Sequence, residues 1–370
     1  MKKEKNVLKL IIPAIFSFSL AAFGRAPATY SQVRNELVKV TQKNIIDHVN
    51  GLVSVSAPSR MVGKPGHDRA RNYLVESIKA ADPKNTGSLK VMTFRPDIEE
   101  AKSFYQKEFQ DKVEGKIPSQ RPAYQKWFRF TSYIKTMAES LKTVEGSNII
   151  WEKIGLNPNK TLLITAHYDT ITLDTSTLTI PENLPMPGAN YNASSVAVGL
   201  NLIRILSQID LNYSVQIVFL DWQSIGFLGS LDYAKELKLS KTNLLGFINL
   251  EMLGQDTSYF DKTKKKGNMS VYYRPEDESF VRKLNDHGSK ITSKVTFEMK
   301  ALGFEQSDNF RFWDQGFIGA TFSQNWEDDF NPKFFQTQQD TPETLNHETL
   351  YHAYQYLGGA VLGTLLDITK

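Results

Sequence analysis

Thr161-Leu-Leu-Ile-Thr-Ala-His-Tyr-Asp-Thr170 is a continuous run of apolar, β-prone residues that ends in polar side chains. Asn157-Pro158-Asn159 precedes it, so the pattern predicts a buried strand whose last side chains reach the edge of a sheet. Open α/β sheets place their binding sites at this edge, where His167 and Asp169 would lie. A His two residues before a carboxylate is suited to metal binding, because the carboxylate orients the imidazole. The same pattern also fits a buried, hydrogen-bonded His, and this stretch alone leaves both interpretations open.

The composition narrows the class of protein. The chain has 370 residues, of which 41% are hydrophobic and 23% are charged. These values fit one large α/β domain or two small ones, and they exclude a disordered chain and a transporter. The net charge of +4 is mild and no dense basic stripe interleaved with aromatic residues occurs, so no nucleic-acid partner is expected. The chain has no cysteine, which excludes disulfides and thiolate metal ligands.

The N-terminus has the layout of a secretory signal peptide. Lys2, Lys3 and Lys5 precede an apolar segment from Leu10 to Phe23, and small residues follow it. We therefore expect residues 1–28 to be a signal peptide and the protein to be secreted or periplasmic. An uncleaved membrane anchor is the alternative, and no other membrane association is expected. The sequence does not set the oligomeric state.

Strands and helices alternate from residue 147 onward. The predicted strands cover residues 148–154, 162–166, 215–220, 245–250, 269–273, 295–299 and 317–322. The predicted helices cover residues 30–55, as one helix or a broken pair, and residues 67–80, 194–208, 226–237, 276–287 and 348–366. Such alternation predicts a three-layer α/β fold, with a mostly parallel mixed sheet covered by helices on both faces.

Residues 91–144 form a charged, aromatic segment without a place in this alternation. Two helices broken between Gly115 and Pro122 are expected. The segment is too aromatic for a linker, so it should either cap the sheet or the pocket as a lid or dock on a partner protein or the cell envelope.

Six stretches in order resemble the co-catalytic zinc aminopeptidases of metallopeptidase clan MH. This family includes secreted bacterial leucyl aminopeptidases, glutaminyl cyclases and the protease-like domain of the transferrin receptor. The matching stretches are Ala166-His-Tyr-Asp-Thr170, Pro187-Gly-Ala-Asn-Tyr-Asn-Ala-Ser194, Val218-Phe-Leu-Asp-Trp-Gln-Ser-Ile-Gly-Phe-Leu-Gly-Ser230, Ile248-Asn-Leu-Glu-Met-Leu-Gly254, Ser307-Asp-Asn309 and Phe335-Gln-Thr-Gln-Gln-Asp-Thr341. The resemblance implies that residues 29–370 form a single aminopeptidase-like domain, with 91–144 as a helical insertion.

The resemblance implies a di-zinc site that this chain only partly retains. In the family, a His, a bridging Asp, a Glu, an Asp or Glu and a second His hold two zinc ions, and another Glu is the general base. His167 and Glu251 match two of the ligands and remain as a residual metal pair. The other family positions are Tyr191 for the bridging Asp, Ser224 for the Glu ligand, Gln336 for the last His and Gln223 for the base.

Neighbouring positions keep the family pattern and are expected to surround the pocket. They are Asp169, Asn190, Asn192, Asp221, Asp308 and Asp340. The replacements remove carboxylates that are costly to bury together, so the cavity can exist without a metal. The alternative is that Tyr191 and nearby aromatic residues such as Trp222 fill the cavity.

Two functions follow from this resemblance. The first is a secreted, non-catalytic pseudopeptidase that binds a peptide or protein ligand, with no catalytic residue and no cofactor. The second is a metallo-aminopeptidase in which His167 and Glu251, helped by His347 or Asp340, weakly bind a single zinc. A catalytic zinc needs about three protein ligands and a base, which favours the first function.

Overall fold

The computed structural model describes residues 28–171, 174, 179–181, 184–256, 267–304, 306–327 and 333–368. Residues 1–27 of the predicted signal peptide lie outside the described residues. Among the described helices, none is both long and apolar enough to cross a membrane.

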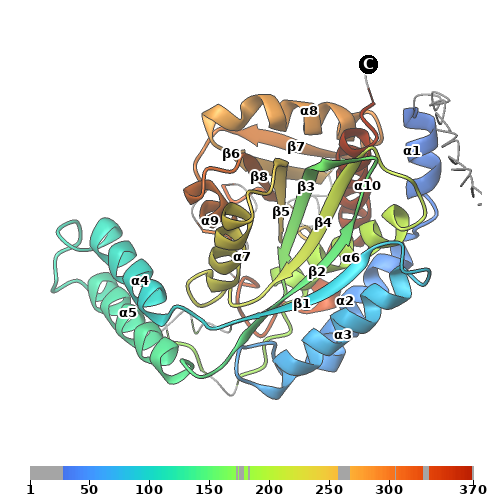
Figure 1. The fold of residues 1–370 in the computed structure, drawn as a ribbon. Helices are drawn as coiled ribbons and strands as arrows, with labels where there is room; N and C mark the ends of the chain where they lie inside the picture. Colours follow the sequence, from blue (N-terminus) through green and yellow to red (C-terminus); the bar gives the residue numbers. More distant parts are fainter. Residues whose placement is uncertain are drawn as a thin grey trace, which may run out of the picture.

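One eight-stranded mixed sheet forms the centre of the molecule (Figure 1). Its strands lie in the order β1-β2-β4-β3-β5-β8-β6-β7. Their bounds are β1 Ser88–Phe94, β2 Gly146–Lys153, β3 Asn157–His167, β4 Tyr213–Leu220, β5 Leu244–Glu251, β6 Gly267–Tyr273, β7 Val295–Lys300 and β8 Gly319–Gln324. The central strands β4, β3, β5 and β8 are parallel, and β6 is parallel to β7, whereas β1–β2, β2–β4 and β6–β8 pair antiparallel. The predicted mostly parallel mixed sheet is confirmed.

Helices cover both faces of the sheet (Figure 1). The helices of the main body are α1 Tyr30–Leu37, α2 Gln42–Ser56, α3 Pro65–Ala81, α6 Ser194–Leu206, α7 Leu228–Leu239, α8 Glu278–Ser289, α9 Asn309–Asp314 and α10 His347–Leu365. The larger core joins α1, α2, α3, α6, α8 and α10 to one face, and a smaller core joins α7 and α9 to the other. Along β3, Leu162 and Ile164 enter the larger core whereas Leu163 enters the smaller one. This alternation explains why the strand reads as continuously apolar.

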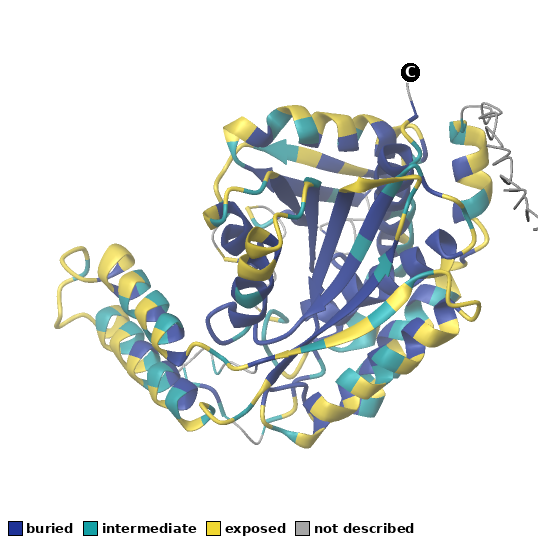
Figure 2. Cartoon of the chain, in the orientation of Figure 1, coloured by how far each residue is buried: buried dark blue, intermediate teal, exposed yellow. Residues whose placement is uncertain are grey.

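Residues 91–144 differ in part from the expected insertion. Residues 91–94 belong to the edge strand β1, in which only Phe94 is buried. This strand lacks the apolar alternation by which strands are predicted. The two helices follow it, α4 Ile98–Lys112 and α5 Pro122–Ser140, and the break between them lies where Gly115 and Pro122 predicted it. They form a hairpin that projects from the sheet, with exposed residues on its outer side (Figure 2).

The parallel arrangement places several chain segments at one edge of the sheet. β3 ends at His167, β4 at Leu220 and β5 at Glu251. Because the carboxyl ends of parallel neighbours meet at the same edge, the residues that follow them converge there.

Candidate functional site

His167 and Glu251 meet at the carboxyl ends of β3 and β5. His167 Nε2 lies 3.2 Å from Glu251 Oε1, and His167 Nδ1 lies 3.0 Å from the backbone carbonyl oxygen of Asp169. A carbonyl oxygen only accepts, so Nδ1 must carry a proton. Glu251 Oε2 accepts from the hydroxyl of Ser307 at 2.7 Å, so both of its oxygens have partners. Both members of the pair are buried.

The electrostatic surroundings make His167 a cation. Burial acts to lower the pKa of His167, but Glu251 and Asp169 outweigh it and raise the pKa to about 10. Near neutral pH both ring nitrogens therefore carry protons, and Nε2 donates to Glu251. The positive charge of the imidazolium is balanced by carboxylates of the chain itself.

Asp169 holds the loop that follows β4. Its Oδ1 accepts from the backbone N–H of Gln223 at 3.0 Å, and its Oδ2 accepts from that of Ser224 at 2.9 Å. Burial would raise the pKa of Asp169, but His167 and these two N–H groups lower it. The carboxylate thus fixes the backbone of Gln223 and Ser224 beside His167.

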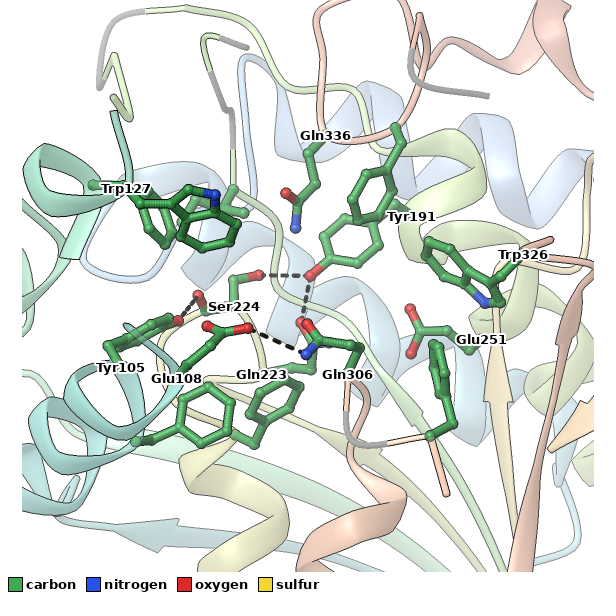
Figure 3. Close-up of a pocket in the computed structure, with 16 residues that line it drawn as sticks. Tyr105, Glu108, Trp127, Tyr191, Gln223, Ser224, Glu251, Gln306, Trp326 and Gln336 are labelled. Carbon is green, nitrogen blue, oxygen red and sulfur yellow. Dashed lines mark hydrogen bonds between the residues drawn. The ribbon is translucent and has the colours of Figure 1, made fainter. Parts of the chain in front are cut away.

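Tyr191 occupies the space next to this ion pair. The centroids of its ring and the His167 ring are 4.7 Å apart, and the side chain is buried. Its hydroxyl donates to Gln223 Oε1 and lies 3.4 Å from Ser224 Oγ (Figure 3). Asp340 holds the backbone, since its two oxygens accept from the N–H groups of Asn190 and Tyr191 at 2.8 and 2.9 Å.

Asn190 and Asn192 connect the Tyr191 segment to the sheet. The amide of Asn192 donates to the carbonyl of Leu250 at 3.0 Å, and its oxygen accepts from the N–H of Met252 at 2.8 Å. Asn190 donates to Gln324 Oε1 at 2.9 Å. Both residues are therefore structural supports of the site rather than groups facing a ligand.

Asp221 lies away from the cavity in a separate buried network. It accepts from His67 Nε2 at 2.7 Å and from the backbone N–H of Ser147 at 2.8 Å. Burial lowers the pKa of His67, but Asp221 outweighs this effect and raises it overall. Sequence reasoning missed His67, and also the buried Arg60, whose guanidinium donates to three backbone carbonyls around the site. Residues 60 and 67 lie far from their partners in the sequence, so no local pattern could have indicated these contacts.

Asp308 is the least satisfied carboxyl of the site. Neither of its oxygens has a hydrogen bond of ordinary geometry among the described residues. Burial, together with Glu251 and Asp169, raises the pKa of Asp308 to about 7, although His167 and a weaker contact with the Ser230 hydroxyl lower it. Burial also raises the pKa of Asp340 to about 6, against the two backbone N–H groups that it accepts from.

Four residues around the site have a backbone in the left-handed region. They are Trp222, Phe227, Met252 and Gln336, with φ between 47° and 57°. Side chains other than Gly adopt this region at an energetic cost, and such residues gather at functional sites. The unusual local backbone after β4 and β5 is thus part of the site.

A cavity of about 440 Å³ lies above these groups (Figure 3). Nine of its sixteen lining residues are aromatic. The insertion supplies Phe104, Tyr105, Glu108, Trp127 and Phe130, while Tyr191, Gln223, Ser224, Glu251 and Gln336 line the side next to the sheet. Tyr191 lines the cavity without filling it, and Trp222 is fully buried elsewhere. The volume is in the usual range of small-molecule sites.

Residues 148–361 match the model of peptidase family M28. The chain belongs to peptidase family M28. Aminopeptidase YwaD from Bacillus subtilis (strain 168) is 24% identical over 214 residues, which cover 54% of this chain and 40% of that protein. The chain spans between about a quarter and two fifths of the length of the curated relatives it matches.

Solved structures of aminopeptidases share the architecture. The Legionella pneumophila LapA aminopeptidase superposes with a TM-score of 0.64 at 13% identity, covering 92% of this chain and 76% of that one. The aminopeptidase from Aneurinibacillus sp. strain AM-1 gives a TM-score of 0.61 at 16% identity, covering 90% and 96% of the two chains. At these identities the similarity concerns the fold alone.

The M28 fold implies zinc, and the residues present fit it poorly. Among the described residues, no group of three or more His, Cys, Asp and Glu side chains is arranged to hold a metal ion. His167 Nε2 lies 3.2 Å from Glu251 Oε1, so the two residual ligands contact each other, and a metal would have to displace the proton between them. Asp340 is occupied by backbone N–H groups, and His347 begins α10 outside the cavity lining.

Sequence reasoning gave a lid over the sheet or the pocket as one role of the aromatic insertion, and Trp127 of the insertion does line the cavity. It missed Glu108 of the insertion, and Phe304, Gln306 and Trp326 from loops near β7 and β8. The aromatic content of residues 91–144 was the one signal for part of this wall. The loop residues carry no motif that would have indicated their position.

Proposed function

We propose that this chain is a non-catalytic member of peptidase family M28 that binds a peptide-like ligand in the aromatic cavity. One observation carries the proposal. Tyr191, Gln223 and Ser224 stand at the positions that the family resemblance assigns to the bridging Asp, the base and a Glu ligand, and they are hydrogen-bonded to one another. The space of the former metal site is thus organised by neutral side chains.

The chemistry of these groups does not support peptide hydrolysis. An amide such as that of Gln223 cannot take a proton from water, and loss of a general base alone lowers a rate by roughly 10²- to 10⁴-fold. Neutral phenol, amide and hydroxyl groups are also poor ligands for a divalent transition metal. His167 and Glu251 are paired with each other, which removes the two remaining candidates.

The cavity supports a binding role. It stays open beside the cluster, and its apolar lining with a few polar groups is typical of a ligand site. The predicted signal peptide adds that this binding takes place outside the cytoplasm.

The test is an aminopeptidase assay of the purified chain with peptides of free N-terminus, with and without added zinc. We expect no zinc-dependent release of an N-terminal amino acid, together with saturable binding of some of the same peptides. Release that depends on zinc and is abolished by His167→Ala would overturn the proposal.

A further inference from the structure

The mild net charge of the whole chain hides a local excess of positive charge on the insertion. From Gly115 to Ala138 the chain has five Lys or Arg residues and no Asp or Glu. Most of this stretch is α5, which carries three cations and one acid, whereas α4 carries three cations and four acids. The two helices of the hairpin therefore differ in charge, and α5 is the basic one.

α5 turns one side toward solvent. Five exposed residues on neighbouring turns form what we call the outer face of α5: Arg121, Gln125, Phe128, Arg129 and Ser132. The other side of the helix packs into the protein through buried residues that include Ile134 and Met137. Figure 2 shows exposed residues along the outer side of the projecting hairpin. The basic side of the hairpin is thus open to a partner.

The cations of the outer face are not neutralised by the chain. Among the described residues, neither Arg121 nor Arg129 has an ion pair. Most acids of α4 are already paired, and the pairs are Glu99 with Lys102, Glu100 with Arg311 and Glu108 with Lys112. Guanidinium groups bind phosphate oxygens through pairs of parallel hydrogen bonds. The two arginines therefore favour an anionic partner that carries phosphates.

Phe128 adds an apolar contact to this basic face. It is 51% exposed, and its ring centroid lies 6.5 Å from that of Tyr124 and 6.1 Å from that of Phe109. These neighbours hold the ring in place, so its burial in a partner costs little further ordering. Basic helices with an exposed aromatic ring are typical of segments that lie on membranes, where the cations contact phosphates and the ring enters the acyl layer.

We infer that the outer face of α5 docks on a membrane surface that contains anionic phospholipids. Arg121 and Arg129 bind lipid phosphates, and Phe128 enters the acyl layer beside them. Of the two partners that the sequence left open for the insertion, a protein or the cell envelope, this face fits the lipid surface of the envelope. The inference goes beyond the proposed ligand-binding function and does not depend on it, since other residues of α5, Trp127 and Phe130, line the cavity.

The experiment is co-sedimentation of residues 29–370, the chain expected after removal of the signal peptide, with phospholipid vesicles. One set contains phosphatidylcholine alone, and the other contains phosphatidylcholine and the anionic phosphatidylglycerol. We expect binding to the anionic vesicles only, and salt should weaken it. Arg121→Gln/Arg129→Gln should bind these vesicles at least about tenfold more weakly, because both cations lose their lipid phosphates. Phe128→Ala should weaken binding about fivefold.

Lys84→Gln/Lys235→Gln is the matched control, because it removes the same charge from exposed positions outside the insertion. It should leave vesicle binding as in the parent. Equal losses in the two double variants, or equal binding of the parent to both kinds of vesicle, would overturn the inference. Binding of soluble polyglutamate without binding of anionic vesicles would also overturn it and assign the face to an acidic protein.

Discussion

At the scale of single residues, neutral side chains hydrogen-bond to one another beside the buried carboxylates of the site. Burial, together with Glu251 and Asp169, raises the pKa of Tyr191, so its phenol stays protonated and donates. A carboxylate in its place would add a third negative charge beside Glu251 and Asp169, and His167 alone could not balance it. The hydroxyl instead links the ring to Gln223 and Ser224.

Tyr191→Phe removes this link while keeping the ring. Gln223 Oε1 then loses its donor, and we expect the free energy of unfolding to fall by about 0.5–1.5 kcal/mol. Urea unfolding measures the change. Tyr351→Phe is the control, since Tyr351 lies on α10 outside the cavity lining and its hydroxyl accepts from Gln355 at 3.1 Å. Equal effects of the two substitutions would contradict the role given to the Tyr191 hydroxyl.

Asp308 gives the site a pH-dependent stability. Its pKa is raised from 3.8 to about 7 in the folded chain. Between these values the folded state binds the proton more strongly than the unfolded state, so stability falls as the pH rises toward 7. Asp308→Asn removes the titration, and the variant should be more stable than the parent at pH 8 by up to about 4 kcal/mol.

The same variant should lose this advantage near pH 4, where Asp308 of the parent is protonated in the folded state. Thermal unfolding at both pH values checks the prediction, with the exposed Asp314→Asn as control. A stabilisation of Asp308→Asn that is independent of pH would show that the carboxyl does not titrate as described.

At the scale of elements, hydrophobic periodicity predicted the helices and strands that bury a regular apolar face. The strands β4 and β5 and the helices α6 and α10 lie close to their predicted ranges, because each buries a continuous apolar surface. β3 starts at Asn157, earlier than predicted, because its first four residues are exposed and carry no apolar pattern. The edge strand β1 was not predicted, since it buries little. The segment around Tyr191 shows no hydrophobic periodicity. Its conformation is set by tertiary hydrogen bonds of Asp340 and Asn192.

The inner and outer faces of α5 should behave differently. Ile134 is fully buried in the cluster that joins the insertion to the site, whereas Phe128 is 51% exposed on the same helix. Ile134→Ala should lower the free energy of unfolding by about 2–5 kcal/mol and weaken ligand binding, because the cavity wall loses its support.

Phe128→Ala should change neither stability nor ligand affinity by much. Unfolding curves and titration of both variants measure the contrast. The opposite pattern, with Phe128 needed for ligand binding and Ile134 dispensable, would indicate that the hairpin acts as a docking surface rather than as a wall of the cavity.

At the scale of the whole molecule, the fold and the site differ in how far they follow from the sequence. The mostly parallel mixed sheet, its two covered faces and the meeting of His167 with Glu251 follow from local patterns and from the family resemblance, whereas the order of the strands comes from the structure. The partners of His67, Arg60 and Glu108 do not, because these contacts join positions 100 to 200 residues apart. The choice of ligand therefore depends on the assembled cavity rather than on any sequence motif.

The most direct test of the central claim is the metal content of the purified protein. Elemental analysis before and after a zinc soak, beside a His167→Ala control, measures how much zinc the chain holds. We predict no stoichiometric zinc in either protein, because His167 and Glu251 are paired with each other. About one tightly bound zinc per chain, lost in the His167→Ala control, would contradict the account and restore the metallopeptidase interpretation.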